Sequence, residues 1–175
     1  MKKFLKIIGG VILTLIALYL VSCFFGPSHF FIEKKIVINA SQDSIFNQVA
    51  NYSKWNAWSP WSEADPQMKS QFIEEPLHVG HKWSWTSESQ GNGSQTILAL
   101  DYPNKIRMEL NFEGMDPSYT HWNFSKRDQG VEVSWDMDGG EVPFFQRGMM
   151  LLFQGMIEDD YEKGLNKLKE VCEKN

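Results

Sequence analysis

Between Gln67 and Gly139 the chain alternates apolar and polar residues in five or six short stretches joined by turn-like segments. Residues 105–112, for example, set Ile106 and Met108 against Arg107 and Glu109. Strict alternation with short joints is typical of an antiparallel meander that has one solvated face. The other face is apolar, so something else in the chain must cover it.

The C-terminal residues 143–175 change to helical spacing and supply that cover. The recurring residues are Phe145, Met149, Leu152, Met156, Tyr161, Leu165, Leu168 and Cys172. The second half of this helix is amphipathic, whereas residues 148–156 are apolar almost all round. Together with a strand over 30–40 and a helix that Ser41 caps, the pattern predicts an α+β fold: a curved antiparallel sheet wrapped around one long C-terminal helix.

An N-terminal apolar run precedes this domain. Ile7 to Phe25 is 19 residues without a charge, which as a helix spans roughly 28 Å, close to the hydrocarbon thickness of a bilayer. Lys2, Lys3 and Lys6 precede the run, so we expect the N-terminus in the cytoplasm and the domain on the outer, extracytoplasmic side of a single-pass membrane protein. The expected division is residues 1–27 as anchor and linker and residues 28–175 as the folded domain.

Two other interpretations of the apolar run stay open. A cleaved signal peptide is one, although no A-x-A-like site follows the run. A lipoprotein signal is the other, because "LVSC" ends at Cys23 and loosely fits a lipobox. With an uncleaved anchor or a lipid on Cys23, the domain is tethered to a membrane.

Charge and cysteine content exclude several classes of function. All 22 acidic residues but only 14 of the 17 basic residues lie after Phe25, so the domain carries a net charge of −8. This charge argues against nucleic acid as a partner. Cys23 and Cys172 are the two cysteines; with Cys23 at the membrane, a disulfide within the domain is not expected.

Trp55, Trp58 and Trp61 are spaced by three in a polar, proline-containing segment. This spacing suits a short helical turn that Pro60 ends at Ser59. The three indoles either plug the open end of the sheet or form the aromatic rim of a cavity entrance.

The chain resembles the SRPBCC superfamily, and more narrowly its membrane-anchored polyketide cyclase/dehydrase-like members, whose fold is the helix-grip of START and birch-pollen-allergen domains. The resemblance covers roughly residues 30 to 172. It rests on "INASQDSIF" at Ile38–Phe46, "WNAWSPW" at Trp55–Trp61, "DPQM" at Asp65–Met68 and "YEKGLNKLK" at Tyr161–Lys169. It implies a cavity between the sheet and the long helix that can hold an apolar molecule; fold alone does not fix the activity.

Alternation and helical phase predict which side chains would line such a cavity. They are Trp83, Trp85, Leu98, Met108, Leu110, Trp122, Trp135, Met149 and Phe153. The same four tryptophans could instead fill the core and leave a small residual pocket. A ligand pocket is normally about 300 Å³ or more, so a cavity under about 100 Å³ together with no co-purifying apolar ligand would count heavily against binding.

No catalytic constellation is recognisable. His78 and His81, preceded by Glu74 and Glu75, would lie on opposite faces of a strand and predict no metal site. Asp136 and Asp138 are expected to be solvated on the outer face. Thr120, Glu88 and Arg147 are the remaining polar candidates near a cavity mouth. The sequence therefore predicts no cofactor and favours a non-enzyme.

Three hypotheses follow. The preferred one is a membrane-tethered, non-catalytic domain that binds a hydrophobic small molecule or lipid. A polyketide cyclase- or hydrolase-like enzyme would need a buried ionisable side chain in the cavity with a displaced pKa. A module that binds another envelope protein would need a solid core and an exposed apolar patch near Trp58 and Trp61.

Overall fold

The structure, a computed structural model, describes residues 2–73 and 75–174. Its contacts divide the chain into two compact units. The first contains Met1–Phe30 and Gly140–Ile157, and the second contains Phe31–Gly139 and Glu158–Asn175. The C-terminal helix α4, Phe144–Glu173, begins in the first unit and ends in the second.

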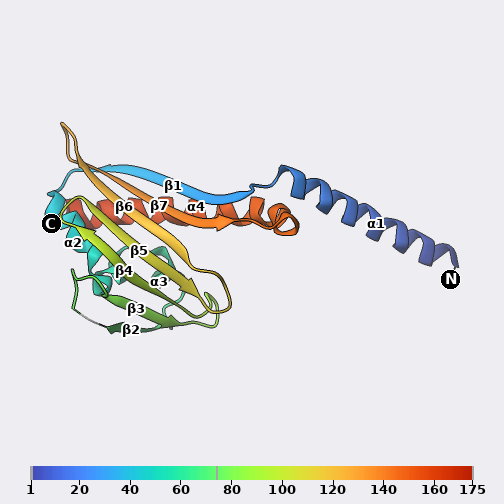
Figure 1. Ribbon diagram of the computed structural model, residues 1–175, viewed down its shortest axis with the longest axis horizontal. Helices are drawn as coiled ribbons and strands as arrows, with labels where there is room; N and C mark the ends of the chain where they lie inside the picture. The colour runs from blue at the N-terminus through green and yellow to red at the C-terminus, as the bar shows by residue number, and fades with distance from the viewer. Residues whose placement is uncertain (1, 74, 175) are drawn as a thin grey trace. The chain divides into compact units, whose positions relative to one another are not determined.

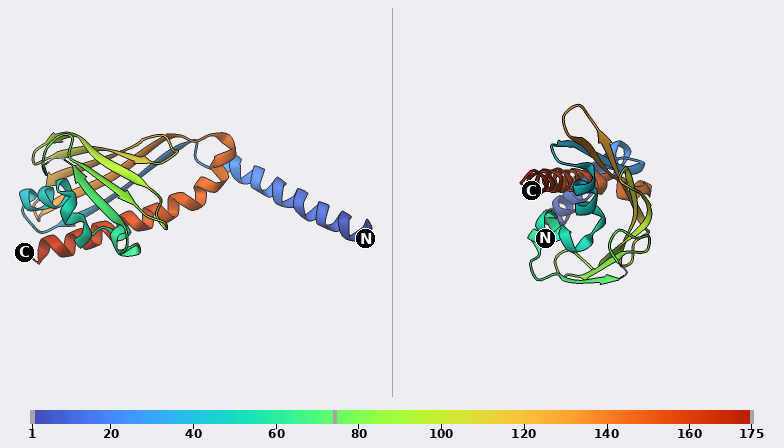
Figure 2. Two further views of the ribbon diagram at one scale, coloured as in Figure 1. Left: turned by 90° about the horizontal axis from the view of Figure 1, so that it is seen from below. Right: turned by 90° about the vertical axis from the view of Figure 1, so that its left-hand side faces the viewer.

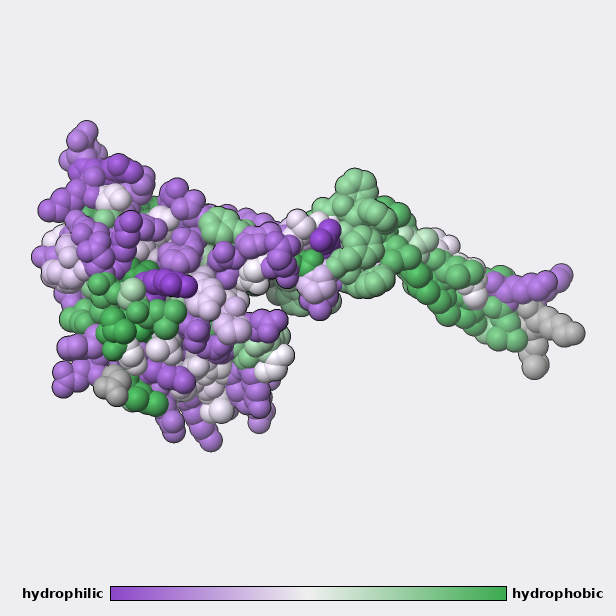
Figure 3. All heavy atoms as spheres, in the orientation of Figure 1, coloured by the Kyte–Doolittle hydropathy of each residue, from purple (hydrophilic) through white to green (hydrophobic). Residues whose placement is uncertain are grey.

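The first unit contains the N-terminal helix α1, Lys2–Phe25. Lys3–Phe25 is long and apolar enough to cross a membrane, and no other helix in the described residues is; a signal sequence near the N-terminus has the same length and composition. Apolar atoms cover α1 along nearly its whole length (Figure 3). An apolar surface of this extent is unstable in water and suits a lipid environment.

A seven-stranded antiparallel sheet forms the framework of the second unit, in the spatial order β1-β7-β6-β5-β4-β3-β2 (Figure 1). All strands after β1 follow one another as neighbours, as the short turns between them predict. The strands are β1 His29–Ile38, β2 Lys69–Ile73, β3 Lys82–Thr86, β4 Gly93–Asp101, β5 Lys105–Phe112, β6 Ser118–Lys126 and β7 Val131–Glu141.

Three short helices connect β1 to β2: α2 Gln42–Ala50, the 3-10 helix η1 Tyr52–Ala57 and α3 Pro60–Ala64. The Ser41 side chain accepts a hydrogen bond from the Ser44 backbone N–H and caps α2, as predicted. Pro60 occupies the first turn of α3, where the missing N–H of proline costs nothing.

The core of the second unit lies between the sheet and the C-terminal half of α4. Tyr161, Leu165, Leu168 and Cys172 are buried along one face of that half. The sheet curves around α2, α3 and this part of α4 (Figure 2). Gly164 allows close approach, because a Cβ there would lie 3.1 Å from Trp135 Cζ3 and 3.3 Å from Pro60 Cδ. The predicted α+β fold with a curved sheet and a long C-terminal helix is confirmed.

The outer face of β7 is less solvated than the alternation predicts. Asp136 is only 8% exposed, and its Oδ1 lies 2.6 Å from His121 Nδ1 on β6. Beside it, the buried Ser134 donates a hydrogen bond of 2.7 Å to Glu33 on β1. Burial raises the pKa of Asp136, with the His121 contact opposing that shift. The expectation of a solvated Asp136 is therefore wrong, because β1 and β6 flank β7 and cover it.

Candidate functional site, a tryptophan-lined cavity

All seven tryptophans of the chain join in one contact network, the tryptophan cluster: Trp55, Trp58, Trp61, Trp83, Trp85, Trp122 and Trp135. Trp135 on β7 is its centre. Its ring stacks on Trp122 at 4.3 Å between centroids and on Tyr161 of α4 at 3.7 Å. Trp55, Trp58 and Trp61 also meet it edge-on, at 6.3, 6.1 and 5.7 Å. The cluster therefore links the sheet to η1, α3 and α4.

The segment with tryptophans spaced by three is held by local hydrogen bonds. The Asn51 side chain accepts from the Ser53 backbone N–H at the start of η1. Trp55 Nε1 donates to the Val49 carbonyl at 2.8 Å. Trp55 and Trp58 are each 1% exposed, whereas Trp61 is half-buried. Trp55 and Trp58 are therefore part of the packed interior, and Trp58 itself adds almost no exposed apolar surface.

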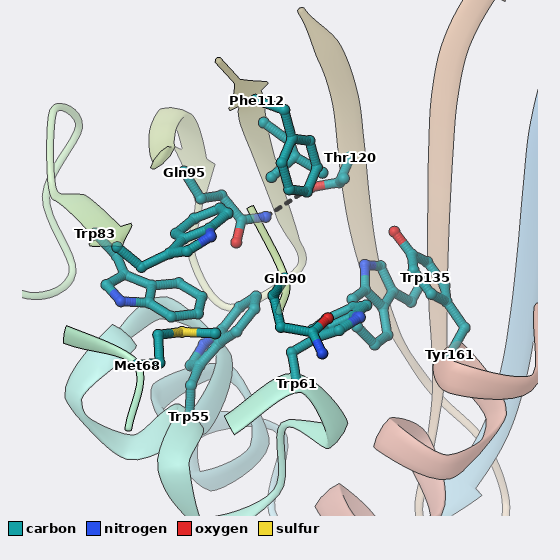
Figure 4. A pocket seen from close by; sticks show the side chains of 12 residues that line it. Trp55, Trp61, Met68, Trp83, Gln90, Gln95, Phe112, Thr120, Trp135 and Tyr161 are labelled. Atoms are coloured by element: carbon teal, nitrogen blue, oxygen red, sulfur yellow. Dashed lines mark hydrogen bonds between the residues drawn. The ribbon is translucent and has the colours of Figure 1, made fainter. Parts of the chain in front are cut away.

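A cavity of about 100 Å³ remains inside the second unit. Aromatic side chains make up most of its wall, and Gln95 and Thr120 meet on the side opposite Trp55 and Trp61 (Figure 4). The lining residues are Trp55, Trp61, Met68, Trp83, Trp85, Gln90, Gln95, Leu110, Phe112, Thr120, Trp135 and Tyr161. The sheet, η1, α3 and α4 all contribute to this wall.

The polar groups of the cavity are neutral. Gln95 on β4 is 4% exposed, and its Nε2 donates to Thr120 Oγ1 on β6 at 3.3 Å. Within the described residues, no Asp, Glu, Lys, Arg or His lines the cavity. Among these lining residues, Tyr161 is the one with an ionisable side chain. Burial, together with the Asp136 carboxylate, raises the pKa of Tyr161 well above its ordinary value. Tyr161 therefore keeps its proton at neutral pH.

One buried donor beside the cavity lacks an acceptor. Trp135 Nε1 makes no hydrogen bond to any of the described residues, although the side chain is 1% exposed. A buried N–H without an acceptor costs about 1–3 kcal/mol. Trp122 Nε1 and Trp58 Nε1 are in the same state deeper in the cluster. The cavity wall is therefore largely apolar, and Trp135 Nε1 is a donor in one of its lining side chains that has no partner among the described residues.

Residues 29–173 match the family model described as polyketide cyclase / dehydrase and lipid transport. The chain belongs to this family. The match extends over the sheet, the short helices and α4, so the resemblance seen in the sequence motifs is confirmed. A comparison with curated proteins found no match.

Solved structures with the same fold are remote in sequence from this family member. Protein SA2116 from Staphylococcus aureus, described as of unknown function, aligns with a TM-score of 0.66 at 11% identity, over 83% of this chain and 94% of that one. Protein CV1439 from Chromobacterium violaceum aligns with a TM-score of 0.60 at 16% identity, over 82% of this chain and 98% of that one. The di-domain ARO/CYC StfQ from the steffimycin biosynthetic pathway aligns with a TM-score of 0.65 at 11% identity, over 83% of this chain and 51% of that one. At these identities the likeness shows the fold alone.

The structure brings some of the predicted site residues of this polyketide cyclase/dehydrase-family chain together at the cavity. Trp83, Trp85, Leu110 and Trp135 line it, as do Trp55 and Trp61 of the predicted entrance. Trp58, Met108 and Trp122 are buried without lining it. Met149 and Phe153 belong to the first unit and are 49% and 44% exposed.

Leu98 also lies away from the cavity, and a β-bulge explains why. Ile97 pairs with Met108 and Ala99 with Arg107, so Leu98 is the extra residue between two ladder positions. The bulge shifts the phase of β4, which puts Gln95 and Ile97 on the buried face. If Ile97 had been taken as facing inward, alternation toward the start of β4 would have placed Gln95 on the same inner face.

Other lining residues gave weaker signals. Tyr161 belongs to the helical stripe of α4 and could have been found from it. Met68 lies between α3 and β2 and Gln90 between β3 and β4, in connecting segments where no period applies. Of the polar candidates, Thr120 lines the cavity, but Glu88 is exposed outside it and Arg147 lies in the first unit.

The two histidines do not form a metal site in the described residues, where no group of three or more His, Cys, Asp or Glu side chains is placed to hold an ion. His81 is 2% exposed and stacks on Tyr52 at 4.8 Å. Its Nδ1 lies 3.1 Å from the Ile73 carbonyl. His81 is therefore packed against η1 in the interior of the second unit. Glu74, part of the same sequence pattern, lies outside the described residues.

Proposed function

We propose that the chain is a membrane-tethered helix-grip domain that binds the apolar end of a hydrophobic small molecule or lipid and performs no chemistry on it. The observation that carries the proposal is a cavity walled by aromatic rings and free of charged side chains within the described residues. Such a wall favours apolar groups and gives no acid or base that titrates near neutral pH. The family description, which includes lipid transport, supports this class of ligand.

The cavity volume limits which part of the ligand is enclosed. About 100 Å³ is below the roughly 300 Å³ of an ordinary small-molecule pocket. An engineered apolar cavity of about 150 Å³ holds one benzene molecule. This cavity is smaller than that, so it encloses at most a short apolar branch of a ligand, and the remainder of the ligand lies outside it.

The polar groups of the wall specify what that enclosed end carries. Trp135 Nε1 is a donor without an acceptor among the residues that the structure describes, and the Gln95 amide is held in place by Thr120. A carbonyl or ether oxygen near the apolar end would accept from the indole N–H and remove its desolvation cost. We therefore propose a ligand that is apolar at its end with one hydrogen-bond acceptor close by.

Tethering by α1 fits such a ligand, because an insoluble molecule is concentrated in the bilayer. In the proposed topology the lysines before α1 stay in the cytoplasm and the domain lies on the outer side. Intact-mass measurement of the chain extracted from membranes tests the tether. The uncleaved anchor gives the mass of the complete chain, and a lipoprotein gives a chain that begins at Cys23 and carries lipid.

Co-purification tests the binding proposal. The full-length chain is purified in detergent and extracted with organic solvent, and the extract is compared by mass spectrometry among three proteins. Leu110→Trp places an indole in the cavity wall, whereas Val79→Trp adds the same group at a site that is 62% exposed and outside the lining. We expect an apolar molecule at a constant molar ratio with the unmodified chain and with Val79→Trp, and its loss with Leu110→Trp.

Bulk lipid extracts equally from all three proteins, so only the difference between variants counts. Equal extracts from Leu110→Trp and Val79→Trp would contradict the proposal.

A second candidate function, a cyclase-type enzyme, is favoured by Tyr161. This tyrosine is a buried ionisable group in the cavity wall with a displaced pKa, as the enzyme hypothesis requires. Because its pKa is raised, Tyr161 can donate a hydrogen bond to a carbonyl oxygen but cannot act as a base at neutral pH. Tyr161→Phe separates the two functions: it leaves co-purification intact for a binding domain, and abolishes product formation with retained binding for an enzyme.

A further inference from the structure

The first three turns of α4 carry an exposed apolar stripe, defined by Phe145, Met149, Leu152 and Met156. These side chains are 68%, 49%, 74% and 62% exposed, in that order. Their spacing places them on one face of the helix over about 16 Å. Leu151 and Phe153 beside the stripe are 45% and 44% exposed. Apolar faces of this size on a water-soluble surface are uncommon and mark an interaction site.

The same stretch is free of charge. No Asp, Glu, Lys or Arg occurs between Arg147 and Glu158, whereas charges are dense from Glu158 onward. The change coincides with the boundary between the two units at Ile157 and Glu158. The helix therefore has one half composed for an apolar environment and one half composed for water.

Within the first unit, this part of α4 contacts the last two turns of α1. The Tyr19 hydroxyl donates to the Phe145 carbonyl at 2.5 Å. The rings of Phe24 and Phe144 meet at 5.1 Å. Gly148 permits the contact, because a Cβ there would collide with Ser22 Oγ. The exposed stripe thus begins directly beside the candidate membrane span.

The position of Tyr19 along α1 shows at what depth of a bilayer the stripe would lie. Tyr19 precedes the end of α1 at Phe25 by six residues, which is about 9 Å along a helix. A group that contacts Tyr19 therefore lies within the apolar or interfacial layer once α1 crosses a bilayer. Tyrosine itself is enriched at that level of membrane proteins.

We infer that the apolar stripe of α4 is embedded in the bilayer, in contact with acyl chains at the membrane interface, as a second attachment besides α1. The inference rests on the proposed crossing of the membrane by α1. Lipid is the occupant because the stripe continues the apolar surface of α1 and carries no charge that would select a protein partner. A helix held this way presents its apolar face to the acyl boundary, as interfacial helices do.

Spin labelling of the full-length chain in vesicles tests the inference. Cysteines are introduced one at a time as Leu152→Cys, Met149→Cys, Glu162→Cys and Leu13→Cys, and a nitroxide is attached to each. Glu162 is an exposed position on the charged half of α4, and Leu13 reports on α1. The native Cys23 and Cys172 are 0% and 3% exposed and take up little label, which the unsubstituted chain checks. The vesicles are an equimolar mixture of phosphatidylethanolamine and phosphatidylglycerol.

Relaxation by oxygen, which concentrates in lipid, is compared with relaxation by a water-soluble nickel chelate. We expect labels at residues 13, 149 and 152 to relax more with oxygen and the label at residue 162 to relax more with nickel. If the labels at residues 149 and 152 relax more with nickel while the label at residue 13 relaxes more with oxygen, the inference is overturned and the tether remains in place. Spin–spin broadening at 152 overturns it in favour of a second copy of the chain. Nickel preference at 13 overturns both the tether and the inference, without bearing on ligand binding.

Discussion

Replacing Trp135 by alanine is expected to lower the free energy of unfolding by about 3–5 kcal/mol, the usual cost of removing a large aromatic side chain from a core. The physical reason is its central position: Trp135 is 1% exposed, stacks on both Trp122 and Tyr161, and thereby joins β6 to α4. Denaturant unfolding of the full-length protein in detergent, followed by far-ultraviolet circular dichroism, measures the loss.

Trp61→Ala is the matched control for this prediction. Trp61 belongs to the same cluster and meets Trp135 at 5.7 Å, but it is half-buried, so we expect a smaller loss of about 1–2 kcal/mol. Trp135→Phe retains an aromatic ring and gives a folded protein if the alanine variant does not fold. Equal losses for Trp135→Ala and Trp61→Ala would contradict the central role of Trp135.

Gly164→Leu is expected to lower the free energy of unfolding by about 2–3 kcal/mol, as overpacking does in a closely packed core. At this position α4 lies against Trp135 and Pro60, and even a Cβ would come within 3.3 Å of both side chains. A leucine must therefore push the helix away from the sheet or displace the indole. The same denaturant measurement detects the change.

Gly155→Leu in the same helix is the control, because a Cβ there meets nothing within 4 Å. Leucine favours a helix over glycine, so this variant should gain about 0.5–1 kcal/mol. The two substitutions are chemically identical and differ only in what surrounds the glycine. A shift in the same direction for both would contradict the close contact of α4 with Trp135.

The sequence predicts the fold because strand alternation and helical spacing each depend only on residues close together in the chain. Alternation along β5 to β7 and the helical stripe from Tyr161 to Cys172 follow directly from which face each side chain occupies. Ser41 marks the start of α2 through its own side-chain chemistry, and Pro60 marks a helix boundary, although it begins α3 and does not end a helix as expected. These features need no knowledge of the neighbouring strands, and for that reason they could be predicted.

The candidate site depends on features that local patterns do not contain. The β-bulge at Leu98 inverts the phase of β4 and exchanges Leu98 for Gln95 on the cavity wall. Asp136 is buried beside side chains of the neighbouring strands β1 and β6, including His121, and alternation along β7 alone does not reveal that cover. The cavity volume is the small remainder left among closely packed aromatic side chains, and no count of apolar residues predicts such a difference.

The stacking of Trp122 on Trp135, at 4.3 Å and 18°, has a spectroscopic consequence. The electronic transitions of two indoles at this separation couple, which we expect to contribute to the circular dichroism of the folded chain. That signal depends on the mutual orientation of two rings and vanishes once they move apart. The chain therefore carries an intrinsic optical reporter at the centre of its core, readable without any added dye.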